Sequence, residues 1–133
     1  MKNKQPIQLF SQPRPMDKPG FKLWQGFLLW QAQVDAALLP YNLTQTSFAI
    51  LSLVGWLTQD QDQVRQKQIT VLAGMQKMQV SLTVQRLLKF GFISVVSSDI
   101  DRREKIILLT ERGKTVLEET IPLIDAIDVK LKI

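Results

Sequence analysis

Apolar residues recur at intervals of three and four along much of this chain, a spacing that places them on one face of a helix. Residues 21–39 form the first such stretch, which ends at Pro40. Residues 48–57 are mostly apolar on every side and follow Thr44, a residue type that commonly caps a helix N-terminus. Because all-round apolarity is typical of a covered helix, we expect residues 48–57 to lie at the centre of the fold.

Two shorter helices joined by a tight turn are predicted after a polar loop. Residues 66–73 and 76–90 both show helical spacing, and Gly74 between them can adopt the positive φ of such a turn. In the second of these helices the valines mark a buried face, so the opposite face is exposed. That exposed face holds amide, basic and two apolar side chains but no acidic one: Met78, Gln79, Leu82, Gln85, Arg86 and Lys89.

Beyond this helix the period of the pattern changes from helical to strand-like. Residues 92–97 and 104–109 are the two arms of a predicted β-hairpin, whose polar tip carries two adjacent arginines. Thr110 then caps a last amphipathic helix over residues 111–131. The apolar stripe of that helix needs a surface to cover it, and a second subunit is the natural candidate.

Composition excludes several kinds of site. The chain of 133 residues has room for one domain, and its apolar content of 45% is that of an ordinary globular protein. It contains no histidine and no cysteine, which excludes zinc sites built on imidazole or thiolate, Ser/His and Cys/His nucleophile pairs, and thiol redox switches. The acids show no convergent pair either, so we expect no enzyme activity, no metal site and no cofactor.

Positive charge gathers in two parts of the chain, which has a net charge of +5 at pH 7. Residues 1–23 and residues 66–103 each carry +4, whereas residues 24–65 carry −2 and residues 104–133 carry −1. The basic segments are thus the N-terminus and the predicted helix, turn, helix and hairpin tip. This distribution is typical of a nucleic-acid-binding module that is flanked by other helices.

Residues 1–20 are predicted to form an extended basic arm ahead of a domain over residues 21–133. The four prolines of the arm each fix φ and disfavour a helical conformation in the preceding residue. The arm has no apolar run that resembles the core of a signal peptide, and the longest apolar stretch of the chain is about half of a bilayer span. We therefore expect a cytoplasmic protein without a membrane segment.

The order of these elements resembles that of the MarR family of winged helix-turn-helix transcriptional regulators, and the likeness covers roughly residues 24–131. Three features carry it: the segment 69–93 (ITVLAGMQKMQVSLTVQRLLKFGFI), the hairpin tip with Asp101, Arg102 and Arg103, and the segment 109–113 (LTERG) that opens the last helix. Each feature alone is common. Their order and spacing make the resemblance specific.

The resemblance implies a fold that is mainly α with a small β-hairpin wing, in which a winged helix-turn-helix is flanked by dimerisation helices at about 21–39 and 111–131. It also implies a homodimer whose recognition helices enter successive major grooves of double-stranded DNA while the wings reach adjacent minor grooves. Asp101 and Arg103 match the acid and the arginine of the family's wing. Carried over to the recognition helix, the DNA contacts are Lys77, Gln79, Ser81, Leu82, Gln85 and Arg86.

The chemistry of these side chains independently suits such roles. Glutamine and serine can read base edges, Leu82 and Met78 can contact thymine methyl groups, and Arg86 and Lys89 suit phosphates. Arg103 on a narrow hairpin can enter a minor groove, with Asp101 holding its guanidinium. Arg102 is also expected to contact DNA, although arginines at a hairpin tip can simply prevent pairing with another strand.

The predicted function is therefore a sequence-specific DNA-binding regulator, a repressor, that acts as a homodimer. The alternative is a winged-helix module for protein interaction or for a replication complex, without operator binding and with Met78 and Leu82 as its anchors. Many MarR relatives have a pocket for a small aromatic ligand, although aromatic residues at helical spacing are more often part of a core. The candidates for such a pocket are Trp24, Trp30, Tyr41 and Trp56.

Overall fold

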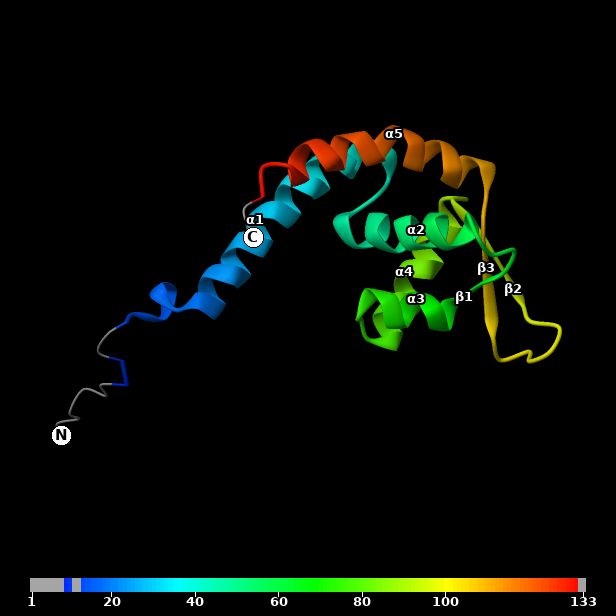
Figure 1. Cartoon of the computed structure of the whole chain (residues 1–133), viewed down its shortest axis with the longest axis horizontal. Helices are drawn as coiled ribbons and strands as arrows, with labels where there is room; N and C mark the ends of the chain where they lie inside the picture. Colours follow the sequence, from blue (N-terminus) through cyan, green and yellow to red (C-terminus); the bar gives the residue numbers. More distant parts are fainter. Residues whose placement is uncertain (1–8, 11–12, 132–133) are drawn as a thin grey trace, which may run out of the picture. The chain divides into compact units, whose positions relative to one another are not determined.

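The computed structural model describes residues 9–10 and 13–131 (Figure 1). Helices dominate, and a small antiparallel sheet forms the wing, so the predicted winged helix-turn-helix fold is confirmed. The elements, with η marking 3-10 helices, are η1 (Pro15–Asp17), α1 (Pro19–Leu38), η2 (Leu39–Tyr41), α2 (Gln45–Thr58), β1 (Val64–Arg65), α3 (Gln66–Ala73), α4 (Lys77–Lys89), β2 (Ile93–Ser97), β3 (Lys105–Leu109) and α5 (Glu111–Asp128).

The described residues form two compact units, which divide between Gln33 and Val34 and are called the first and the second unit. The boundary lies within α1 and not after residue 20, where the sequence places the end of the arm. Its position follows from burial, because Val34 and Leu38 are the buried side chains of α1. All of the winged helix-turn-helix belongs to the second unit.

The prediction of an extended arm is wrong for the last part of that segment. Residues 15–17 form η1, and α1 begins at Pro19. Proline at the first position of a helix is favourable, because that position needs no backbone N–H and the fixed φ suits a helix. Gly20 therefore lies inside α1 and does not end the arm. Residues 1–8 and 11–12 of the predicted arm lie outside the described residues.

Helix α2 occupies the centre of the second unit, where it contacts α3, α4, α5 and β3. Thr44 caps it as predicted: its Oγ1 accepts a hydrogen bond from the backbone N–H of Ser47 at 3.1 Å, and the Ser47 hydroxyl accepts one from Thr44 N–H at 2.8 Å. Burial is not complete around the helix, since Trp56 is 65% exposed. The expected central position is thus confirmed, but the expected cover on every side is wrong.

The helix-turn-helix follows the predicted bounds closely. Gly74 adopts the expected left-handed conformation, with φ of 65°, and separates α3 from α4. Val80, Val84 and Leu87 of α4 are buried, and they lie on the face that the sequence pattern selects. The opposite face of α4 is therefore free of any role in the core.

The wing is a three-stranded antiparallel sheet with the strand order β1-β3-β2. Ile93 pairs with Leu109 and Val95 with Ile107, so β2 and β3 form the predicted hairpin, which projects from the helices in Figure 1. The additional strand β1 pairs Val64 with Ile107. Two residues are too few to show an alternating pattern, so this strand has no signature in the sequence.

The wing is joined to α5 by a close packing of backbone. Thr110 Oγ1 donates a hydrogen bond to the carbonyl oxygen of Gly91 at 2.6 Å and accepts one from Gly113 N–H at 3.0 Å. A β-carbon at Gly113 would overlap the carbonyl oxygen of Phe92, so only glycine fits there.

No described helix has both the length and the apolarity that a membrane span requires.

Candidate nucleic-acid interface

Helix α4 presents an exposed face that carries only amides, bases and apolar groups. Met78 is 74% exposed and Leu82 is 60% exposed. No acidic residue occurs between Lys77 and Lys89, and both Arg86 and Lys89 lie in the last turn, where the helix dipole favours positive charge. Of the side chains that the sequence predicts to contact DNA from α4, the exposed ones are Lys77, Gln79, Leu82, Gln85, Arg86 and Lys89.

The C-terminal half of this face is hollowed. A hollow of about 650 Å³ is lined by Leu82, Gln85, Arg86, Lys89 and Phe90. It combines two cationic side chains with an amide and two apolar groups. Such a surface suits a polyanion whose backbone is charged and whose bases expose apolar and hydrogen-bonding edges.

Ser81 differs from its neighbours on α4 because it is half-buried. Its Oγ accepts a hydrogen bond at 3.0 Å from Nε2 of Gln66, the first residue of α3. The side chain that the sequence predicts as a base contact is thus already held by a glutamine of the preceding helix. Nothing in the sequence pattern singles out Gln66 for this role.

The wing tip carries the predicted acid and arginines. Asp101 Oδ1 accepts a hydrogen bond from the backbone N–H of Arg103 at 3.0 Å, and it lies 4.0 Å from Arg103 Nε. The Arg103 side chain is 97% exposed, and Arg102 is exposed as well. Asp101 therefore shapes the backbone of the tip more strongly than it holds the guanidinium, which leaves the charge of Arg103 at the surface.

An ion pair connects the base of the wing to the start of α3. Arg65 Nε lies 3.0 Å from Glu104 Oε1. The sequence offers no sign of this pair, because its members are 39 positions apart and belong to elements that the pattern treats separately. The tertiary structure therefore adds Arg65, Gln66 and Glu104 to the side chains that touch the predicted interface.

The four aromatic residues proposed for a ligand pocket lie in different environments. Trp24 and Trp30 belong to the first unit and make ring contacts with Phe21 and Phe27, with centroids 5.5 Å and 6.0 Å apart. Trp56, in the second unit, is largely exposed. Tyr41 lines a pocket of the second unit.

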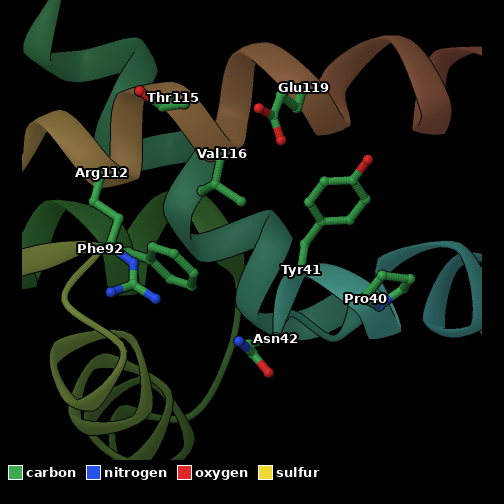
Figure 2. Close-up of a pocket in the computed structure, with 8 residues that line it drawn as sticks. All are labelled: Pro40, Tyr41, Asn42, Phe92, Arg112, Thr115, Val116 and Glu119. Carbon is green, nitrogen blue, oxygen red and sulfur yellow. The ribbon is translucent and has the colours of Figure 1, made fainter.

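This pocket has a volume of about 340 Å³ and contains both rings and charges (Figure 2). Figure 2 shows Val116 of α5 between the rings of Phe92 and Tyr41. The Arg112 guanidinium carbon lies 5.6 Å from the centroid of the Phe92 ring, in cation–π contact. The remaining lining residues are Pro40, Asn42, Thr115 and Glu119.

Across the described part of the chain, no three acidic side chains come together as a metal site requires.

Comparisons with known proteins agree with this geometry. The family model of the transcriptional regulators SarA/Rot matches residues 36–120. The uncharacterized HTH-type transcriptional regulator YdcH of Bacillus subtilis (strain 168) is 33% identical over 114 residues, which cover 86% of this chain and 78% of YdcH.

Two solved structures are also similar. A MarR-family transcriptional regulator from Rhodococcus sp. RHA1 is 26% identical with a TM-score of 0.74, over 89% of this chain and 80% of that one. CouR from Rhodococcus jostii RHA1, solved with bound p-coumaroyl-CoA, is 27% identical with a TM-score of 0.71, over 88% and 79% of the two chains. The resemblance to MarR-family regulators is confirmed.

Proposed function

The chain belongs to the SarA/Rot family of transcriptional regulators, and from this premise we propose that it binds a specific site in double-stranded DNA as a homodimer and represses transcription. The observation that carries the proposal is the exposed face of α4, which has no acid, in the same compact unit as a wing that carries Arg102 and Arg103. Apart from Lys67 of α3, the basic side chains of residues 66–103 lie on α4 and the wing, the two elements that a winged helix uses against DNA.

In this proposal the side chains of α4 divide into two kinds of contact. Gln79, Ser81 and Gln85 read base edges in the major groove, where amides and hydroxyls can distinguish donor and acceptor patterns. Leu82, with Met78 beside it, contacts thymine methyl groups. The basic side chains of Lys77, Arg86 and Lys89 neutralise phosphates and fix the register of the helix on the duplex.

The wing supplies a minor-groove contact in the same proposal. Arg103 is almost fully exposed, and the backbone of the tip that carries it is held by Asp101. A guanidinium at the end of a narrow hairpin matches the negative potential of a narrow minor groove. Arg102 beside it contacts phosphate.

The first unit supports the homodimer. None of its described side chains is buried, and its helix exposes large apolar groups, with Leu23 and Leu29 each 69% exposed and Trp24 56% exposed. Large apolar side chains exposed in such number typically mark an interface. A second copy of the chain would cover it and would present a second recognition helix to a half-site about one helical turn away.

Fluorescence anisotropy at two salt concentrations tests the proposal, on duplexes selected by the protein from a random-sequence library. Arg86→Ala and Arg103→Ala should each weaken binding by about 1–3 kcal/mol while leaving the unfolding transition unchanged. Lys114→Ala removes the same charge from α5 and is the matched control, for which we expect little change. The proposal would be contradicted if the protein selected no duplex, or if its affinity for DNA did not change with salt concentration.

A second candidate function concerns the pocket in Figure 2. We propose that it binds a small aromatic ligand, with Tyr41 and Phe92 contacting the ring and Arg112 pairing with an acidic group. CouR, of similar sequence, was solved with an aromatic acyl-CoA bound. Trp24, Trp30 and Trp56, which the sequence also predicts as ligand contacts, are not among the residues that line this pocket. Titration with aromatic carboxylates, followed by Trp fluorescence and by release of DNA, tests this; equal binding by Arg112→Ala would contradict it.

The protein-interaction alternative rests on the apolar groups of the helix-turn-helix. Val71 is 75% exposed and Leu72 55% exposed, in addition to Met78 and Leu82. Under this alternative Leu82→Asp abolishes capture of a partner protein, and the purified protein selects no DNA. Selection of a duplex by the wild-type protein decides in favour of the DNA-binding function.

A further inference from the structure

The junction between β1 and α3 lies between the two elements that are proposed to contact DNA. Val64 and Arg65 pair with β3 of the wing, and Gln66 begins the first helix of the helix-turn-helix. The consecutive side chains of Arg65 and Gln66 reach different elements. That of Arg65 contacts the wing, and that of Gln66 contacts α4.

Arg65 holds the residue that closes the wing tip. Its ion pair with Glu104 has an Nε–Oε1 distance of 3.0 Å, and the Glu104 side chain is only 23% exposed. The Glu104 carbonyl oxygen accepts a hydrogen bond from Ser98 N–H at 2.9 Å, and its N–H donates to the Asp101 carbonyl oxygen at 2.9 Å. Arg65 thus contacts, through a side-chain ion pair, the residue whose backbone hydrogen bonds close the loop that carries Arg103.

Gln66 sets the hydrogen-bonding direction of Ser81. Its Nε2 donates to Ser81 Oγ, whereas its Oε1 is buried and has no hydrogen-bond partner within residues 9–10 and 13–131. Because the serine oxygen already accepts a hydrogen bond, its proton stays available for donation. Ser81 can thus donate to an acceptor on a base edge, such as a purine N7, without losing its contact with Gln66.

We propose that Arg65 and Gln66 are positioning residues, which hold the wing tip and Ser81 in one fixed relation so that both elements engage DNA together. This inference rests on the proposed DNA-binding function and adds the residues that set its register and part of its base preference. The Arg65 side chain is 54% exposed, and an ion pair at such a surface contributes little to folding. Its effect should therefore be measurable in DNA binding and not in stability.

Charge reversal tests the wing contact on a duplex that the wild-type protein selects from a random-sequence library. Arg65→Glu and Glu104→Arg should each remove the hydroxyl-radical protection that the wing gives to the flanking minor groove, while protection by α4 in the major groove persists. Up to about fivefold weaker binding should accompany the loss. The double variant, which restores the pair with exchanged partners, should restore the flanking protection.

The design separates positioning from simple electrostatics. Arg65→Glu and Glu104→Arg change the net charge in opposite directions, so a general charge effect would change affinity in opposite directions as well. Lys114→Glu and Glu118→Arg make the same two changes on exposed positions of α5 and serve as matched controls. Loss of flanking protection in both single variants, with recovery in the double variant, is the expected result.

The contact with α4 is tested by Gln66→Glu, which keeps the shape of the side chain but replaces its donor with an acceptor. The Ser81 proton would then point toward residue 66, and binding to the selected duplex should fall by up to about tenfold, with a changed preference at one base pair. Gln68→Glu adds the same charge two positions away, where Oε1 already accepts a hydrogen bond from Arg65 N–H at 3.0 Å. In a Ser81→Ala background, Gln66→Glu should have no more effect than Gln68→Glu.

Failure of this inference is distinguishable from failure of the proposed function. If the wild-type protein selects no duplex, DNA binding itself is overturned. If it selects a duplex but the charge-reversed variants retain flanking protection, or Gln66→Glu behaves like Gln68→Glu, then DNA binding stands and the positioning role is overturned. Unfolding curves that match that of the wild-type protein show that each variant is folded.

Discussion

The two units of the chain use their apolar side chains in opposite ways. Every buried hydrophobic residue of the described structure lies at or after Val34, and these residues form the core beneath the winged helix-turn-helix. In residues 1–33 the described apolar groups include Leu23, Trp24 and Leu29, all more than half exposed. The second unit therefore contains its own source of stability, whereas the first unit exposes its large apolar side chains, as the proposed homodimer requires.

The largest expected effect on stability is at Gly113, where the second unit leaves no space for a β-carbon. Gly113→Ala places a β-carbon against the carbonyl oxygen of Phe92, which is held in place by a hydrogen bond from Thr110 N–H at 3.2 Å. We expect the free energy of unfolding to fall by about 3 kcal/mol or more. Denaturation in guanidinium chloride measures it.

Gly26→Ala is the same substitution in the first unit, where, among the described residues, no atom beyond the chain neighbours and the helix's own backbone lies within 4 Å of the added carbon. Because alanine is the better helix former, it should be neutral or stabilise the helix by about 0.5–1 kcal/mol. Equal effects of the two substitutions would contradict the contrast between a packed unit and an unpacked one.

The next largest effect concerns the large exposed apolar side chains of the first unit. Trp24→Lys together with Leu29→Lys should weaken the proposed homodimer by about 30-fold or more, because large apolar side chains at an interface contribute most of the binding energy. Analytical ultracentrifugation over a concentration series measures the dissociation constant. Val71→Lys, at a 75% exposed position of α3, should leave it unchanged. A dimer that tolerates both substitutions in the first unit must use another surface.

The helix caps give a smaller effect in the second unit. Thr44→Ala removes the hydroxyl that accepts a hydrogen bond from the N–H of Ser47, so α2 loses its cap. The free energy of unfolding should fall by about 1 kcal/mol. Thr58→Ala removes a hydroxyl that bonds only to a carbonyl of its own helix, at Val54, and should change stability by less than about 0.5 kcal/mol. Thermal denaturation of both variants compares the two sites, and similar losses would show that the cap has no special role.

The corresponding cap in the first unit should have the smallest effect, because it lies in solvent. The Arg14 guanidinium donates hydrogen bonds to both Asp17 carboxylate oxygens, at 3.0 Å and 3.1 Å, and holds the pKa of Asp17 below its usual value. The stabilisation of η1 is thus complete above the unfolded-state pKa of Asp17 and is lost as the pH falls through its lower folded-state pKa. NMR titration of the carboxyl should show a lower pKa in the wild-type protein than in Arg14→Ala. Identical titration curves would contradict this.

The candidate DNA interface was predictable where it depends on one element at a time. Gln79, Leu82 and Arg86 are exposed because they lie opposite the buried valines of α4, and helical periodicity is enough to show this. Asp101 and Arg103 are close in sequence, so their contact is local. Arg65, Gln66 and Glu104 were missed because each acts through a contact with another element.

The sequence was sufficient to predict the five main helices and the hairpin in their order, because periodicity, caps and glycine conformations are properties of neighbouring residues. It also determined which sites are excluded, since a chain without histidine or cysteine has none of their chemistry. Three-dimensional packing was needed to reveal that β1 joins the wing, that Tyr41 and Arg112 share a pocket, and that Arg65 contacts the wing while Gln66 contacts α4. These contacts join residues that are distant along the chain, and they depend on how elements pack, which no local pattern records.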